Sequence, residues 1–305
     1  MIPPEWLWIP ITIGAALAQT VRNATQRHLT PILGTLGATL VRFLYGLPFA
    51  VLWLVAVAGV GEFALPASNT RFWIWVVVGS VTQIGATALL LRVMAERNLA
   101  IGVAYTKTEV LQIALFGYIF LGDPVLPGVL GAIAFSTLGV LLLSPIDRNR
   151  PIRTLVSGWT TRAALLGLAA GACFGMASIG FRGAALALEG TAFPMAAAYT
   201  LVIGQALQTV LLGGWLLARN AAIVVRVCRE WRKSILAGLM GAVASACWFT
   251  AFAIEPAAHV KTLALIEILF SYVVGRRIFS DTITRLEGIG MTLLCAGLVL
   301  VTLHA

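Results

Sequence analysis

Apolar runs of membrane-spanning length follow one another along almost the whole chain, and this feature leaves few folds open. We place ten runs, near residues 5–21, 32–60, 72–95, 99–121, 124–145, 163–185, 192–218, 234–254, 258–279 and 283–303. A transmembrane helix needs roughly 20 predominantly apolar residues. A bilayer offers no water to pair with exposed backbone groups, so spanning segments are helices or closed barrels. We therefore predict an all-α membrane protein with ten transmembrane helices.

The composition excludes a soluble domain. Of the 305 residues, 60% are hydrophobic and 11% are charged, whereas soluble chains carry roughly 25% charged residues. The net charge of +9 does not indicate nucleic-acid binding, because no basic stretch is interleaved with aromatic residues. The 4 cysteines show no spacing typical of a metal site. We expect no nucleic acid, no metal and no cofactor.

The chain carries an internal duplication. A shift of 158 positions superposes Glu109 on Glu267 and Asp123 on Asp281. The same shift aligns several alanine, glycine and leucine positions around them. Each of these acidic pairs therefore occupies an equivalent place in the two halves.

The duplication divides the chain into two five-helix repeats. We predict the first repeat at residues 1–147, a basic linker at 148–162 and the second repeat at 163–305. Five is an odd number, so the second repeat must enter the membrane inverted relative to the first. Inverted repeats are common in secondary transporters, which bind substrate near the midplane at the repeat interface.

The loops between the predicted spans differ strongly in charge. Only Arg71 and Arg182 belong to the even-numbered loops. The odd-numbered loops or their edges hold Arg22, Arg27, Arg92, Arg97, Arg148, Arg150, Arg153, Arg162, Arg219, Arg226, Arg229, Arg232, Lys233, Arg276, Arg277 and Arg285. Cytoplasmic loops carry the excess of Lys and Arg. We predict a multi-pass protein of a bacterial-type inner membrane, with both termini periplasmic or outside.

The spans at 99–121 and 258–279 each carry a lysine and a glutamate well inside the apolar run, namely Lys107 and Glu109 in the first and Lys261 and Glu267 in the second. A charge at mid-bilayer costs at least ~2.5–3.5 kcal/mol, so it needs a partner or a function. On an ideal helix Lys107 points about 200° away from Glu109, and Lys261 likewise diverges from Glu267. We therefore predict reciprocal pairs across the repeats, Lys107 with Glu267 and Lys261 with Glu109. The alternative is that these pairs only lock helices together.

Further polar side chains lie within the spans. Tyr105, Thr108, Glu109 and Gln112 follow helical spacing and predict one polar stripe on the fourth span. Arg42 lies inside the second span and must face a cavity, an acid or a headgroup. The amides Gln83, Gln205 and Gln208 would line the same cavity or form helix–helix hydrogen bonds.

Three features at the ends of the spans are explained by local structure, without a role in binding or transport. Arg92 and Glu96 have i,i+4 spacing and predict a surface ion pair. Asp123 and Asp281 are predicted to cap the helices that follow them. Residues 219–233 read as a short basic amphipathic helix on the membrane surface.

The ends of the two halves resemble those of the drug/metabolite transporter superfamily, in its ten-helix EamA-type branch. The resemblance rests on Thr108-Glu109-Val110-Leu111 through Phe120-Leu121-Gly122-Asp123, and on Ile266-Glu267-Ile268 through Phe279-Ser280-Asp281. A glycine-rich span follows each segment. Val110 and Ile268 stand where the family often has proline. The resemblance implies ten helices in two inverted repeats and transport of a small metabolite.

We expect a secondary active transporter, exporting or exchanging a small organic metabolite. Arg42, Lys107 and Lys261 outnumber Glu109 and Glu267, which favours an anionic or zwitterionic substrate. No Walker-type phosphate loop is present, so a proton or a counter-substrate would drive transport, with membrane lipid around the protein. The alternatives are a flippase of a lipid or lipid-linked sugar and, more remotely, an intramembrane enzyme. The oligomeric state stays open.

Overall fold

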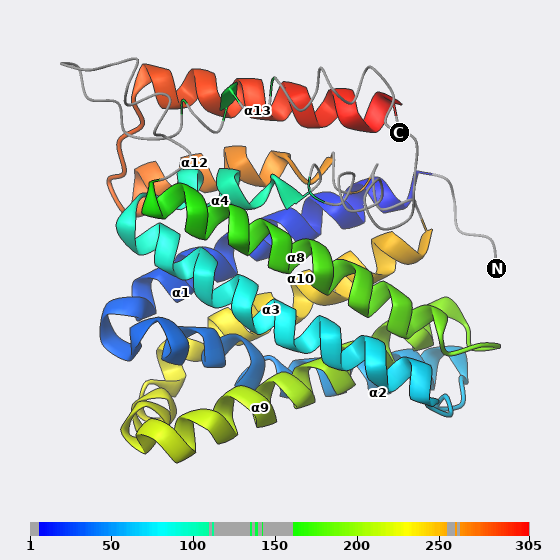
Figure 1. The fold of residues 1–305 in the computed structure, drawn as a ribbon. Helices are drawn as coiled ribbons and strands as arrows, with labels where there is room; N and C mark the ends of the chain where they lie inside the picture. Colours follow the sequence, from blue (N-terminus) through cyan, green and yellow to red (C-terminus); the bar gives the residue numbers. More distant parts are fainter. Residues whose placement is uncertain are drawn as a thin grey trace.

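The computed structural model describes residues 6–109, 161–254 and 263–304, together with residues 112, 135, 138, 139, 142 and 260. Over these residues the only regular secondary structure is α-helix, as the sequence predicts. The helices are α1 (Trp8–Leu44), α2 (Leu47–Gly61), α3 (Thr70–Glu96), α4 (Leu99–Thr106), α8 (Arg162–Leu186), α9 (Phe193–Arg229), α10 (Trp231–Ile254), α12 (Ile266–Ile278) and α13 (Arg285–His304) (Figure 1).

Five helical stretches in the described part of the chain are long and apolar enough to cross a membrane. They are Trp8–Gly61, Thr70–Glu96, Arg162–Leu186, Phe193–Arg229 and Trp231–Ala251. Each contains one or more of the apolar runs that the sequence predicts as spans. The later part of the predicted span at 99–121, beyond Glu109 and apart from Gln112, falls outside the described residues. So do most of the span at 124–145 and residues 148–160 of the linker.

The first two predicted spans are not separated by a loop. Residues 22–31 continue α1, which changes direction only at Gly34 (φ 72°, ψ 167°). This conformation has a positive φ, which glycine adopts without steric cost. The polar residues that suggested a loop are covered by neighbouring helices instead, since Arg22, Asn23 and Gln26 are fully buried. The prediction of a loop between the first two spans is therefore wrong.

The predicted surface helix at residues 219–233 is helical, but it is not a separate element. Helix α9 extends to Arg229 and bends at Asn220 (φ −158°, ψ 74°), and α10 starts at Trp231. Most residues of this segment are exposed. Tyr45 Oη donates a hydrogen bond to the Val227 carbonyl at 3.0 Å, which ties the bent end of α9 to the junction of α1 and α2.

The closest packing joins helices from different halves of the chain. Helix α8 runs along α3 (Figure 1), and a Cβ at Gly180 would lie 2.7 Å from the Gly79 nitrogen and 3.0 Å from the Trp75 carbonyl oxygen. Helix α1 packs in the same way against α10. Small residues allow such close approach of two helix backbones. The two halves are thereby interlocked.

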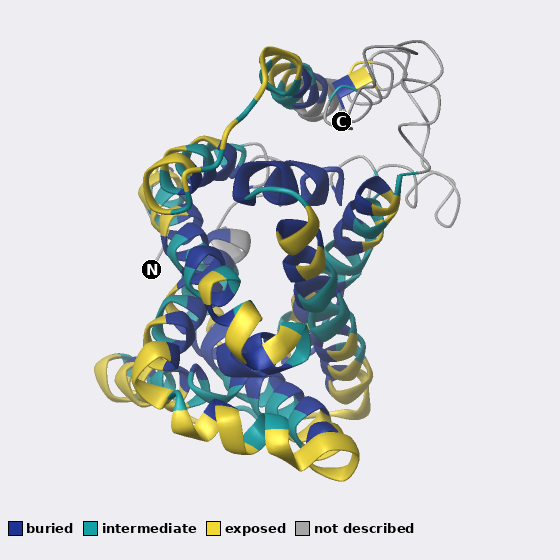
Figure 2. Cartoon of the chain, turned by 90° about the vertical axis from the view of Figure 1, so that its left-hand side faces the viewer, coloured by how far each residue is buried: buried dark blue, intermediate teal, exposed yellow. Residues whose placement is uncertain are grey.

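Burial is arranged as expected for helices surrounded by lipid. Buried residues follow the inner faces of the helices and exposed residues their outer faces (Figure 2). The exposed faces are rich in large apolar side chains, among them Leu52, Val55 and Val210, each more than 60% exposed. Contiguous apolar surface of this kind marks contact with a membrane or another protein.

Candidate functional site

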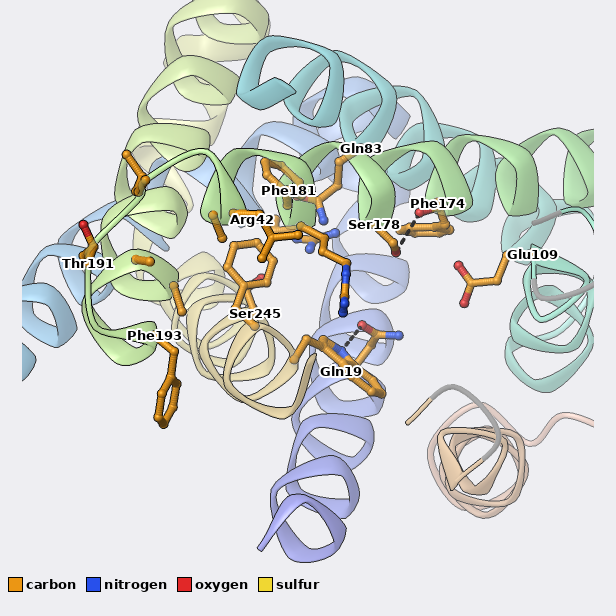
Figure 3. Close-up of a pocket in the computed structure, with 18 of the residues that line it drawn as sticks. Gln19, Arg42, Gln83, Glu109, Phe174, Ser178, Phe181, Thr191, Phe193 and Ser245 are labelled. Carbon is orange, nitrogen blue, oxygen red and sulfur yellow. Dashed lines mark hydrogen bonds between the residues drawn. The ribbon is translucent and has the colours of Figure 1, made fainter. Parts of the chain in front are cut away.

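A cavity of about 400 Å³ lies among helices α1, α3, α4, α8, α9, α10 and α12. Its inner end is polar and includes Gln19, Arg42 and Glu109 (Figure 3). Lys107 and Glu267 line the same end. Its outer end is formed by the connection between α8 and α9, residues 187–192, and by the adjoining turns of both helices. Ligand pockets commonly have volumes of 300–1,000 Å³ with few polar groups in apolar walls. This cavity is the candidate site.

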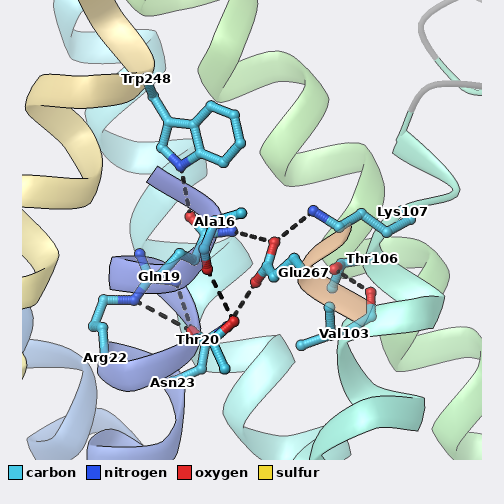
Figure 4. A network of polar contacts seen from close by, with 10 residues as sticks. All are labelled: Ala16, Gln19, Thr20, Arg22, Asn23, Val103, Thr106, Lys107, Trp248 and Glu267. Carbon is cyan, nitrogen blue, oxygen red and sulfur yellow. Dashed lines mark hydrogen bonds and ion pairs between the residues drawn. The ribbon is translucent and has the colours of Figure 1, made fainter. Parts of the chain in front are cut away.

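Glu267, at the start of α12, is the centre of the polar end. Its Oε2 accepts hydrogen bonds from Lys107 Nζ at 2.5 Å and Gln19 Nε2 at 2.8 Å. Its Oε1 accepts from Asn23 Nδ2 at 3.1 Å. Trp248 Nε1 donates to Gln19 Oε1 at 3.0 Å and fixes that amide (Figure 4). Both carboxylate oxygens are thus engaged, which buried charges require.

The ion pair between Lys107 and Glu267 confirms one of the two predicted cross-repeat pairs. Both side chains are buried, at 4% and 1% exposed. The second predicted pair is not tested, because Lys261 lies outside the described residues. Glu109 is buried and lines the cavity, with its carboxylate directed toward it (Figure 3).

The fourth span is not one continuous helix where the charges lie. Helix α4 ends at Thr106, and Lys107 and Thr108 form a turn before Glu109. The hydroxyls of Thr106 and Thr108 donate to the carbonyls of Val103 and Tyr105, each at 2.7 Å. Such local bonds compete with the helical ladder. Because of the turn, Lys107 and Glu109 both line the cavity, although an ideal helix would direct them apart.

The rest of the predicted polar stripe contacts α8 rather than the cavity. A Cβ at Gly167 would lie 2.4 Å from Tyr105 Cβ, and one at Gly171 would lie 2.9 Å from Thr108 Oγ1. Gln112 Nε2 donates to Thr108 Oγ1 at 3.1 Å and to a carbonyl of α8 at 3.0 Å. Of the four residues of the stripe, Glu109 alone lines the cavity.

Arg42 and Gln83 line the cavity, whereas Gln205 does not. Arg42 is 3% exposed and its Nη1 donates to Thr87 Oγ1 at 2.9 Å. Gln83 Oε1 accepts from Gln208 Nε2 at 2.8 Å, so this amide also serves as a helix–helix contact. Gln205 packs against the start of α2, where a Cβ at Gly46 would lie 3.0 Å from its Oε1.

Several residues of the polar end were missed by the sequence prediction. Gln19, Asn23 and Trp248 contact Glu267 or its partners, and Arg22 donates to Asn23 Oδ1 through Nε at 3.2 Å and Nη2 at 2.6 Å. Arg22 was assigned to a cytoplasmic loop, and that assignment is wrong. Arg27 also lies in α1. Without these two residues, the basic residues assigned to the odd-numbered loops still greatly outnumber Arg71 and Arg182. The sequence did contain a signal for these residues, because polar side chains recur at helical spacing from Gln19 to Gln26.

Ion pairs join the two halves at the beginning of α4. Arg27 binds Asp281 through both guanidinium nitrogens, at 2.5 Å and 2.9 Å, and Asp281 Oδ2 also accepts from the Leu99 amide at 3.1 Å. Arg97 pairs with Glu287 at 2.5 Å. The predicted capping role of Asp281 is wrong.

Helix α13 begins later than predicted, at Arg285, and has its own cap. The Glu287 amide donates to Thr284 Oγ1 at 3.2 Å, and Glu287 Oε2 accepts from the Thr284 amide at 2.8 Å. This is a reciprocal capping box. Asp123, the other predicted cap, lies outside the described residues.

The inter-half ion pairs and the outer end of the cavity lie at opposite ends of the molecule. Arg162, the first residue of α8, contacts Glu96 at 3.2 Å beside Arg97, and Glu96 also makes the predicted pair with Arg92 at 3.1 Å. Leu186, the last residue of α8, lines the outer cavity. A helix of this length spans roughly 37 Å. The end that carries the inter-half ion pairs is called the basic end below.

The described side chains give no indication of a metal centre, since no three His, Cys, Asp or Glu gather among them. Comparisons with known proteins identify a fold only. No family model and no curated protein matches the chain. Twelve chains of solved structures match. One, described as "Crystal structure of protein", is 15% identical, has a TM-score of 0.57, and the match covers 97% of this chain and 99% of that one.

Proposed function

We propose that the protein is a membrane-embedded secondary transporter of a small organic metabolite, anionic or zwitterionic, that works by alternating access between two inverted five-helix repeats. The observation that carries the proposal is the cavity. Buried charges line its inner end, one end of the molecule forms its outer wall, and ion pairs between the halves close the opposite end. Alternating access requires a substrate site between two halves that can separate on either side of it.

The exterior of the protein supports the membrane part of the proposal. Five long apolar helical stretches and the exposed apolar side chains on α2, α3 and α9 suit contact with lipid tails. In water such a surface would associate or aggregate. The proposed location is a bacterial-type inner membrane, crossed ten times.

The contacts between halves support the repeat. The shift of 158 positions takes α1 onto α8 and α3 onto α10. The packing of α3 on α8 and that of α1 on α10 are therefore equivalent contacts under exchange of the two halves. Glu109 and Glu267, which the shift also superposes, line one cavity. A pseudo-two-fold axis between the halves explains all three relationships.

The orientation follows from the loop charges. The basic end carries the odd-numbered loops, which we assign to the cytoplasm. The connection at residues 187–192 is an even-numbered loop, so the cavity lies toward the outside. Both termini are then periplasmic or outside, and the ion pairs between the halves lie on the cytoplasmic side.

Transport into proteoliposomes tests the proposal. Candidate substrates are first selected by thermal shift, because a ligand that binds only the folded state stabilises it. Uptake of a radiolabelled ligand above that of empty liposomes supports a transporter. Transfer of a labelled lipid between leaflets without solute uptake would instead indicate a flippase. Product formation in detergent, where no compartments exist, would indicate an enzyme.

A further inference from the structure

Arg42 carries a buried charge that no carboxylate among the described residues neutralises. The centre of its guanidinium lies 5.4 Å from the centre of the Phe43 ring. The side chain lies on α1 and is 3% exposed at the cavity wall. Its Nη1 donates to the neutral hydroxyl of Thr87 at 2.9 Å. Its Nε is buried and has no hydrogen-bond partner among the described residues. Unpaired buried donors and charges are costly, so a side chain kept in this state requires an explanation.

The described charged groups around Arg42 do not supply a counter-ion. Glu267 is already engaged by Lys107, Gln19 and Asn23. The nearest cation adds to the problem: a Cβ at Gly241 of α10 would lie 3.1 Å from Arg42 Cγ and 3.4 Å from Arg22 Cδ, so both arginine stems pack on this glycine. The described inner end holds Arg22, Arg42 and Lys107 against Glu109 and Glu267, which leaves an excess of one positive charge.

Aromatic rings line the walls beyond Arg42. Phe174 and Phe181 lie on α8 (Figure 3), and Trp248 and Phe249 lie on α10. Two charged residues, Arg182 and Glu189, line the cavity as well, toward the connection between α8 and α9. Glu109 lies in the wall formed by the turn after α4. One anionic group can therefore meet Arg42 while an apolar body contacts the aromatic rings.

From this arrangement we propose that Arg42 is the substrate-anchoring residue of the cavity and that its ligand is a small organic monoanion, a monocarboxylate with an apolar body. The ligand carboxylate accepts hydrogen bonds from the guanidinium N–H groups of Arg42 that face the cavity and that Thr87 does not occupy. This geometry is bidentate, and lysine cannot reproduce it. Thr87 is a positioning residue that holds the other side of the guanidinium. This assignment rests on the proposed function, because the bound anion is a substrate only if the protein transports it.

Binding to the purified full-length protein in detergent tests the anchor directly. The probes are 3-phenylpropionate, its neutral isostere 3-phenylpropionamide and the dianion 2-phenylsuccinate, measured by titration calorimetry. We expect the monocarboxylate to bind most tightly. We expect Arg42→Met to weaken its binding by about 10- to 100-fold, the range for a lost charge-assisted hydrogen bond, and Arg42→Lys to restore only part. Arg92→Gln, which removes an exposed arginine from α3, is the matched control and should bind like the wild type.

The melting temperature of each ligand-free variant separates anchoring from a structural role. If Arg42 serves the ligand, Arg42→Met removes an uncompensated buried charge and melts at or above the wild-type temperature. A lower melting temperature together with unchanged affinity for 3-phenylpropionate would overturn the proposal. So would binding of the amide as tightly as the carboxylate. The titration measures binding without any membrane crossing. If 3-phenylpropionate does not bind through Arg42, the anchor proposal fails and the transport proposal stands. If it binds but is not taken up into proteoliposomes, transport alone is refuted.

Discussion

Lys107 Nζ lies 2.5 Å from Oε2 of Glu267, so a residue just after α4 is paired with one at the start of α12, 160 positions later in the chain. The pair joins the two halves at the inner end of the cavity. The Glu267 carboxylate also accepts hydrogen bonds from the side-chain amides of Gln19 and Asn23 on α1. Helices α1 and α12 and the turn after α4 therefore meet at one carboxylate. Any movement of one half against the other must stretch or exchange these contacts.

Replacing one member of this pair should destabilise the protein more than replacing both. Glu267→Gln leaves the Lys107 ammonium buried without its counter-ion, which we expect to cost about 3–5 kcal/mol. Adding Lys107→Met should recover part of that loss. The stability of the four species in a double-mutant cycle, measured by thermal unfolding in detergent, gives the coupling. Strictly additive losses would show that the two residues act independently.

The ion pair between Arg27 and Asp281 should hold the basic end closed. Asp281→Asn removes the charge that binds Arg27 and weakens the acceptor for the Leu99 amide. We expect a Cys placed at Ala100, which is 2% exposed, to react faster with a maleimide in this variant, in a background without native cysteines. Glu230→Gln breaks the exposed pair with Lys233 and is the control. Equal labelling rates in both variants would argue against a gate here.

The two glutamates of the cavity should differ in transport. Glu109→Gln keeps the size of the side chain but cannot exchange a proton, so we expect it to abolish transport driven by a pH gradient while exchange of substrate persists. Glu267→Gln should lose both, because Glu267 orients Lys107, Gln19 and Asn23. Uptake into proteoliposomes with and without a pH gradient checks both variants. Wild-type uptake that ignores the gradient would exclude proton coupling.

The contact between α3 and α8 should tolerate no side chain at Gly180. A Cβ there would lie 2.7 Å from the Gly79 nitrogen and 2.8 Å from its Cα, and neither backbone can move without separating the helices. We expect Gly180→Ala to destabilise the protein by about 1–3 kcal/mol. Gly214→Ala, on α9 where a Cβ meets no atom within 4 Å, should cause no loss. Melting temperatures that fall equally in both variants would contradict the close contact.

Both termini should lie outside the cytoplasm, because the basic loops lie at the other end of an even number of spans. A C-terminal alkaline phosphatase fusion should be active in a bacterial host, and a C-terminal green fluorescent protein fusion should be dark. The same fusions placed after residue 230, in the basic segment, serve as the control and should give the opposite result. Strong fluorescence of the C-terminal fusion would reverse the assignment of the cavity to the outside.

The sequence by itself determined the helical architecture and one important contact. Apolar runs of roughly 20 residues predict helices because backbone groups in lipid must pair within their own segment. The pair of Lys107 and Glu267 could be predicted because a buried charge needs a partner, and neither residue has one on its own helix. The importance of Arg42 and Glu109 follows from the same cost of burial.

Only the tertiary structure decided which polar residues reach the cavity. Helical periodicity assumes a continuous helix, and the turn at Lys107 and Thr108 redirects the charges on either side of it. Arg22 and Asn23 read as loop residues because a sequence does not show that α10 and α12 cover them. Asp281 read as a helix cap because its partner, Arg27, lies 254 positions away. Local sequence fixes the period and the polarity of each helix, whereas long-range packing decides which face of the helix is covered and by which residues.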